Sequence, residues 1–310
     1  MTAVVPDLPA DRRGHLPAIG LMMAGMLLLP CMDAIAKVLS TTYGVTAAQT
    51  TFARFLVQAV VLGGIIVLRH GAGRLRPRHV FVNLVRGAIM ALAVMIFFST
   101  LKTMPLADAL AVFFTEPFIL TILSAVLLGE RIGWRRMAAV VVGFGGAMLV
   151  IRPGYAAFGP VAALPLATAV LFALYLIITR RFAPDDDPMA MQFVSGIGGA
   201  ITIAAVMPFG TLLSLDGFGT APLPAAPFAW LLLLGIGLIA AGGHLMVVHA
   251  FRRAPASLLA PFQYVEIITA SLLGWLIFGD WPDAVRWLGI AIIVTSGLFL
   301  TWRESKAASA

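Results

Sequence analysis

Residues 106–128 read LADALAVFFTEPFILTILSAVLL, and residues 256–278 read ASLLAPFQYVEIITASLLGWLIF. Each run is long enough to cross the hydrocarbon core of a bilayer as a helix, which takes about 20 apolar residues. A shift of 150 positions superposes Glu116 on Glu266, Pro105 on Pro255 and Gly129 on Gly279. The two runs are therefore predicted to be equivalent helices of an internal repeat.

Eight further apolar runs flank these two stretches. In the first half they lie at about 17–40, 47–69, 80–101 and 133–151, and in the second half at about 159–179, 189–209, 227–250 and 285–302. The sequence thus predicts an all-α polytopic membrane protein with ten transmembrane helices in two five-helix repeats, 17–152 and 159–302, between tails 1–16 and 303–310. Because five is odd, the two repeats must cross the membrane in opposite senses, as in many secondary transporters.

The composition excludes several other classes of protein. Of the 310 residues 61% are apolar and 11% are charged, whereas soluble domains carry about 25% charged residues. The single cysteine, Cys31, excludes an internal disulfide, and nothing suggests a metal site or any other cofactor. The net charge of +7 is spread between apolar runs rather than along one face, so we do not expect nucleic-acid binding.

The basic residues predict an orientation in the bilayer. Most of the 21 Lys and Arg residues lie in the tails and in every second loop, at Arg69–Arg78, Arg131–Arg136, Arg180–Arg181 and Arg252–Arg253. Cytoplasmic segments of membrane proteins carry such an excess. We therefore expect a bacterial-type inner (plasma) membrane protein with both termini in the cytoplasm.

Ionisable residues inside spans cost about 2.5–3.5 kcal/mol each on insertion scales and mark functional positions. Six stand out in this sequence: Asp33, Arg54, Arg86, Glu116, His244 and Glu266. Glu116 precedes Pro117, which favours a kink. Both glutamates are expected to bind a substrate ammonium group or to carry a proton, and the alternative is that they lock the two halves together through hydrogen bonds.

The remaining polar candidates divide into a binding set and a gating set. Gln263 and Tyr264, beside Glu266, are predicted to form a substrate wall, with Tyr175 and Gln192 as further polar groups of the cavity. The predicted gating or polar layer consists of Asp33, Lys37, Arg54, Arg86 and His244. An Asp33–Arg54 or an Asp33–Lys37 pair fits the spacing, and a purely structural pair remains the alternative.

Clusters of small residues are interpreted as close helix-packing seams, at Gly143–Gly146, Gly196–Ala200 and Gly235–Gly243. No phosphate-binding loop, His-Glu-x-x-His pair or nucleophile with a neighbouring base is present, so we predict that the protein is not an enzyme. Isolated polar residues, rather than a continuous polar stripe, disfavour a channel.

Two stretches resemble the EamA-type repeat of the drug/metabolite transporter superfamily. They run from Pro105-Leu106-Ala107 to Leu127-Leu128-Gly129-Glu130-Arg131, and from Leu166-Ala167 through Ala173-Leu174-Tyr175-Leu176 to Arg180-Arg181. The resemblance covers residues 17–302 and implies a ten-helix basket around a central cavity that transports small organic solutes. Within the superfamily the chain looks most like YddG-type exporters of amino acids, although it departs from the common pattern at Glu116-Pro117, Glu266 and Asp280.

We therefore expect a transporter that exports amino acids, with aromatic and other neutral ones favoured, by alternating access. The alternative is an importer of a larger metabolite such as S-adenosylmethionine or riboflavin. The expected partners are a small-molecule amino acid or related metabolite, the lipid bilayer and protons as coupling ion, with facilitated transport as the alternative to coupling. No obligate protein partner is predicted.

Overall fold

The computed structural model describes residues 15–101, 106–130, 133–151, 163–215 and 217–278, together with residues 284–285, 287–289, 291–292, 295–296 and 299. These residues form helices, turns and loops without any strand. Residues 1–14 of the predicted N-terminal tail, the predicted C-terminal tail and half of the tenth predicted span lie outside the described residues, as do Lys102, Asp280 and Arg286.

The described helices follow the order of the predicted spans. The first repeat contains α1 (His15–Leu28), α2 (Pro30–Tyr43), α3 (Ala47–His70), the short 3₁₀ helix η2 (Ala72–Leu75), α4 (Val80–Thr100), α5 (Leu106–Phe113), α6 (Glu116–Leu128) and α7 (Trp134–Ile151). The second contains α8 (Ala163–Phe182), α9 (Pro188–Leu212), α10 (Pro227–Arg253), α11 (Ala256–Leu259), the 3₁₀ helix η5 (Ala260–Val265) and α12 (Glu266–Phe278).

Seven helical stretches among the described residues are long and apolar enough to cross a membrane, and α6 is a shorter apolar helix. The seven are His15–Tyr43, Ala47–His70, Val80–Thr100, Ala163–Phe182, Pro188–Leu212, Pro227–Arg253 and Ala260–Ile277. The broken fourth span, α7 and the partly described tenth span complete the plan. The prediction of a ten-helix polytopic membrane protein is confirmed.

Local sequence sets where the helices begin and end. Thr46 and Gln49 form a capping box at the start of α3, and the Asp187 carboxylate accepts a hydrogen bond from Ala190 N at 2.9 Å at the start of α9. α2 and α6 each end at a glycine in the left-handed region, Gly44 with φ 66° and Gly129 with φ 68°. Polar and small residues thus terminate helices that are otherwise uniformly apolar.

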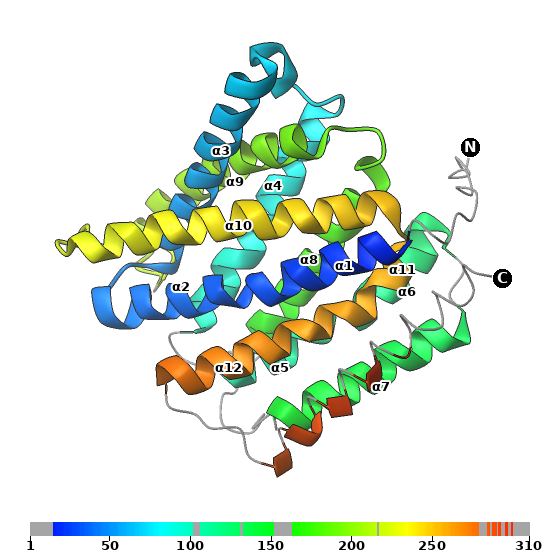
Figure 1. Cartoon of the computed structure of the whole chain (residues 1–310). Coiled ribbons are helices and arrows are strands. Elements are labelled where there is room, and N and C mark those ends of the chain that lie inside the picture. The colour runs from blue at the N-terminus through cyan, green and yellow to red at the C-terminus, as the bar shows by residue number, and fades with distance from the viewer. Residues whose placement is uncertain are drawn as a thin grey trace.

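Helices of the two repeats interlock rather than stand apart. Figure 1 shows α1 with α2, α10 and α12 running side by side, and α1 contacts both α10 and α12. α9 packs against α3 and α4, and α8 packs against α4 and α6. The interface between the repeats therefore runs through the middle of the bundle.

Small residues let the helices approach closely at positions in each of the three predicted clusters. A methyl group on Gly198 would lie 2.4 Å from the Leu84 carbonyl oxygen, and one on Gly237 would lie 2.4 Å from Val57 Cβ. In the third cluster, a methyl group on Gly143 would lie 2.5 Å from the Tyr264 ring, whereas Gly145 has no neighbour within 4 Å. The interpretation of these clusters as packing seams is confirmed at Gly143, Gly198 and Gly237.

Candidate functional site

Both glutamates of the repeat begin an α-helix at an irregular part of their span. In the fourth span α5 ends at Phe113 and α6 begins at Glu116, whereas in the ninth span the 3₁₀ helix η5 leads directly into α12 at Glu266. Pro117 has no N–H for the carbonyl four residues before it, which accounts for the break in the fourth span. Discontinuous helices carry the substrate and ion sites of many transporters. The sequence predicted a kink at Pro117 but not the 3₁₀ segment in the ninth span.

An internal cavity lies between the two repeats. Three ionisable side chains face it, Asp33 of α2, Glu266 of α12 and His244 of α10, and the rest of its wall is mostly apolar. Its volume is about 50 Å³, far below the roughly 300–1,000 Å³ of ligand pockets. The structure therefore describes a contracted cavity, which side chains or helices must enlarge before a solute can enter.

Phenylalanines form the apolar wall of the cavity. Phe97 of α4, Phe113 of α5 and Phe172 of α8 meet in it, with ring centroids 5.5 Å apart for Phe97–Phe113 and for Phe113–Phe172. Such rings offer flat apolar surface and negative ring faces that attract cations. The sequence analysis did not single these residues out, because nothing in a row of apolar residues separates a cavity wall from an ordinary core.

Asp33 and Glu266 provide the acidic part of the cavity. Asp33 is 6% exposed and Glu266 is 8% exposed, and the two carboxyl groups are close enough for their charges to interact. Asp33 forms no ion pair within 4.0 Å with Arg54 or Lys37, although the charge of Arg54 acts on it. Lys37, half-buried one turn further along α2, does not line the cavity. Two carboxyl groups on one small cavity can hold a cationic group between them.

Arg54 and His244 provide the basic part. Arg54 is fully buried, and its Nη2 lies 3.3 Å from Nε2 of His244, while its Nε donates to the Met32 sulfur at 3.1 Å. Because Nδ1 of His244 lies 3.1 Å from the Ala240 carbonyl oxygen and donates to it, Nε2 is left as the acceptor for Arg54. Nη1 of Arg54 has no hydrogen-bond partner among the described residues. Met32 and His244 both line the cavity, whereas Arg54 does not, so its guanidinium lies behind these two residues of the wall.

Arg86 forms a separate buried cluster with two residues of the predicted binding set. Its Nη1 donates to the Thr179 hydroxyl at 2.9 Å, its Nη2 donates to the Gln192 side chain, and its guanidinium lies 5.0 Å from the Tyr175 ring centre. Neither Tyr175 nor Gln192 lines the cavity. In this conformation both residues hold Arg86.

Glu116, Gln263 and Tyr264 lie together behind the cavity wall. Tyr264 is fully buried and its hydroxyl donates to the Phe114 carbonyl oxygen at 3.4 Å. Glu116 is 1% exposed, and Gln263 lies beside its carboxyl group. Of the residues predicted to bind substrate, the structure thus places Glu266 on the cavity and the other three of the midplane group outside its lining.

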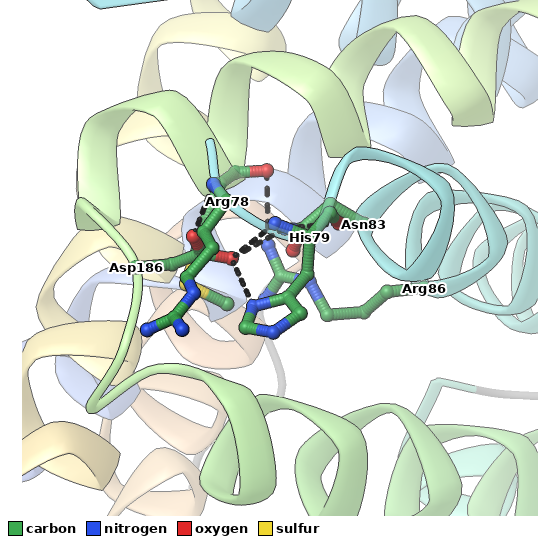
Figure 2. Close-up of polar contacts among 6 residues, drawn as sticks. Arg78, His79, Asn83, Arg86 and Asp186 are labelled. Atoms are coloured by element: carbon green, nitrogen blue, oxygen red, sulfur yellow. Dashed lines mark hydrogen bonds and ion pairs between the residues drawn. The ribbon is translucent and has the colours of Figure 1, made fainter. Parts of the chain in front are cut away.

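Polar contacts close the bundle at the end that carries most of the described arginines, which we call the basic end. Figure 2 shows the Asp186 carboxylate among residues at the start of α4. The carboxylate accepts hydrogen bonds from the backbone N–H groups of Arg78 and His79 and from Nδ2 of Asn83. Its Oδ2 also lies 3.3 Å from Nδ1 of His79. Sequence reasoning missed Asp186, because three consecutive aspartates resemble a solvated loop.

A second contact at the basic end joins the fourth, sixth, eighth and ninth spans. Oε1 of Glu130 accepts from Nε of Arg180 at 3.2 Å and from Ala256 N at 3.1 Å, and Nη1 of Arg180 donates to the Phe251 carbonyl oxygen at 2.9 Å. At the opposite end, the Thr46 hydroxyl donates to the Gly219 carbonyl oxygen at 2.8 Å. The cavity is therefore flanked at both ends by contacts between the repeats.

Taken together, two repeats, a broken fourth span, a 3₁₀ segment in the ninth span and a contracted cavity between the repeats are features of a multi-pass helical transporter. Comparison with known proteins agrees. The EamA-like transporter family model matches residues 16–152 and 159–302, and the chain belongs to this family. A crystal structure of a protein with 22% sequence identity matches the fold with a TM-score of 0.74 over 93% of this chain and 98% of that chain.

Curated relatives of similar length are transporters of different solutes. A riboflavin transporter of Vibrio cholerae is 27% identical over 93% of this chain and 94% of its own. An S-adenosylmethionine uptake transporter of Rickettsia felis is 27% identical over 95% of this chain and 96% of its own. A pseudopaline exporter of Pseudomonas aeruginosa is 26% identical over 87% of this chain and 90% of its own.

Proposed function

We propose that this protein is a carrier for metabolites that combine an α-amino acid head group with an aromatic or apolar part. The observation that carries the proposal is a pair of carboxyl groups on one cavity, with a buried guanidinium behind its wall. Asp33 and Glu266 suit the ammonium of the head group. The unpartnered N–H of Arg54, which contacts the wall residues Met32 and His244, would suit its carboxylate once the cavity enlarges. The phenylalanine wall suits the remainder of the solute.

Within this class, export of aromatic and other neutral amino acids is the first candidate. Such amino acids carry both charges of the head group and a single apolar side chain. Phe97, Phe113 and Phe172 offer them apolar surface next to the charged groups. The small cavity also favours a small solute, since less expansion is needed to admit it.

Uptake of S-adenosylmethionine is the second candidate. S-adenosylmethionine uptake transporters of Rickettsia species align with this chain over nearly its whole length. The same amino acid head group is present in S-adenosylmethionine, whose sulfonium and adenine ring would also suit carboxylates and phenylalanines. Riboflavin lacks the head group and a positive charge, so the charged residues of the cavity favour it less.

The proposal includes a place in the cell. The excess of arginine at the basic end supports a cytoplasmic position for that end and for both termini. An inner-membrane carrier with repeats over 17–152 and 159–302 would then open alternately to the two sides. The contacts of Asp186 and Glu130 would separate when the cavity opens to the cytoplasm.

Counterflow in proteoliposomes tests the proposed function. Vesicles loaded with unlabelled phenylalanine, methionine, threonine, S-adenosylmethionine or riboflavin would be presented with the same solute carrying a label. Saturable counterflow with an amino acid is the expected result. Counterflow with S-adenosylmethionine alone would establish the second candidate, and counterflow with riboflavin alone would refute the head-group argument.

A pair of variants tests the acidic part of the cavity. Glu266→Gln removes the negative charge at nearly constant volume, and we expect it to abolish counterflow while the protein still elutes as a folded particle. Gly64→Ala is the matched control, because a methyl group there meets no atom within 4 Å. Unchanged counterflow by Glu266→Gln would remove Glu266 from the site.

A further inference from the structure

Glu116 is a buried carboxyl group that the proposed substrate site does not use. It begins α6 at the helix break, is 1% exposed and lies outside the lining of the cavity. No described residue makes a well-formed hydrogen bond to either of its oxygens; the adjacent Gln263 is near enough to act on the carboxyl group, but its Nε2 lacks the distance and angle of a hydrogen bond. Nearly all buried polar groups are hydrogen-bonded, so an exception of this kind calls for an explanation.

No positive charge compensates Glu116. Arg54 is held by His244 and Met32, Arg86 by Thr179 and Gln192, and no described Lys or Arg lies within 4.0 Å of the Glu116 carboxyl group. The start of α6 favours a negative charge, but only modestly. Burial of an unpaired ion costs more than a helix terminus returns. Binding of a proton by Glu116 removes that cost.

The surrounding helices offer few other ionisable groups. The charge of Glu116 acts on Tyr264 of η5 and on Glu266 of α12, and Glu266 in turn interacts with Asp33 of α2. The α8 helix contributes Tyr175, which stacks on Arg86, and Arg180, which pairs with Glu130. The α11 helix contains no ionisable residue. The side chains of Asp108 of α5 and of Arg135 and Arg136 of α7 lie outside the described residues.

The charges of the neighbouring groups favour the same conclusion. Glu266 interacts with Asp33 and with Glu116, and the guanidinium that acts on Asp33 is that of Arg54. Arg86 lies in a separate cluster, where the nearby carboxylate is Asp186. A carboxylate at Glu116 would therefore add a negative charge near Glu266 without a guanidinium group to compensate it.

We propose that Glu116 is a proton-binding site, separate from the substrate cavity, through which transport is coupled to the proton gradient. The proposal rests on the proposed function of the cavity. Loss of the proton from Glu116 adds negative charge near Glu266, which strengthens the attraction for the ammonium of the substrate. By reciprocity, binding of the substrate promotes release of the proton. Proton and substrate then bind alternately, which is the requirement for antiport.

The test measures apparent substrate affinity in counterflow at acidic and at neutral pH. For the wild type we expect affinity to fall by about 5-fold or more at acidic pH, the lower end of typical coupling between sites. Glu116→Gln, which mimics the protonated carboxyl group, is expected to hold the affinity at the wild type's acidic value at both pH values. Glu116→Asp keeps an ionisable group and should retain the pH dependence.

Two further measurements separate the outcomes. Thr121→Val is the control, because Thr121 is a buried residue of α6 whose hydroxyl donates only to the Pro117 carbonyl oxygen at 2.7 Å; it should behave like the wild type. Addition of substrate to weakly buffered wild-type protein in detergent should release protons. An unaltered pH dependence in Glu116→Gln, or no proton release, would overturn the proton site alone. Absence of counterflow in the wild type would overturn the proposed function and the coupling with it.

Discussion

The Gly198→Ala substitution probes the seam between α4 and α9, where the two repeats meet. A methyl group on Gly198 would lie 2.4 Å from the Leu84 carbonyl oxygen, and one on Gly87 of the facing helix would lie 2.1 Å from the Ser195 carbonyl oxygen. Close C–H···O contacts between helices have a carbon–oxygen distance of about 3.3–3.6 Å. The two backbones would therefore have to separate by about 1 Å to admit either methyl group.

Both atoms that the new methyl groups would meet belong to the backbone, so no side-chain rotation can relieve the contact. Overpacking of this kind costs about 1–3 kcal/mol. We expect Gly198→Ala and Gly87→Ala each to lower the melting temperature of the purified protein in detergent. Their effects should be less than additive in the double variant, because the first methyl group already separates the helices that the second would push apart.

Gly64→Ala of α3 is the control for helix propensity. Its methyl group meets no atom within 4 Å, so only the gain of about 0.5–1 kcal/mol from replacing a helical glycine remains. The melting temperature, measured by thermal shift with size-exclusion chromatography as a check, should rise or stay constant. Equal melting temperatures for Gly198→Ala and Gly64→Ala would refute the close approach of α4 and α9.

The contacts at the basic end lead to two further predictions. Asp186→Ala leaves the N–H groups of Arg78 and His79 and the amide of Asn83 without their acceptor, so the free energy of unfolding should fall by about 3 kcal/mol. Asp185→Ala, at an exposed neighbour, should change the melting temperature little, and equal effects of the two substitutions would argue against the Asp186 cap. Glu130→Gln weakens the contact with Arg180 but keeps an acceptor for Ala256 N, so we expect the free energy of unfolding to fall by about 0.5–1.5 kcal/mol. A loss as large as that of Asp186→Ala would contradict this estimate.

The architecture was predictable because the bilayer restricts what a chain can do. Spanning segments must be helical and about 20 residues long, so apolar runs show where the helices lie. The register of Glu116 with Glu266 and of Pro105 with Pro255 revealed the repeat. The seam around Gly198 was predictable for a similar reason, since small residues allow helix backbones to approach closely.

The site was less predictable, because its composition depends on which faces of different helices meet. Ionisable residues drew attention to Asp33, Glu266 and His244, and all three line the cavity. Tyr175 and Gln192 were identified as polar residues, but their neighbour Arg86 holds them away from it. Phe97 and Phe113 went unrecognised, since a phenylalanine of a cavity wall has the same sequence context as one in a core.

The Asp186 cap has a consequence for how the chain assembles in the membrane. Asp186, the acceptor, follows the donor Asn83 of α4 by 103 residues in the sequence. At a synthesis rate of roughly 5–20 residues per second, the acceptor emerges about 5–20 s after α4. During that interval the first repeat is inserted with these donors still lacking Asp186. An isolated first repeat would keep these donors without the Asp186 acceptor. The first repeat therefore depends on the second repeat to satisfy the hydrogen-bond donors at the start of α4.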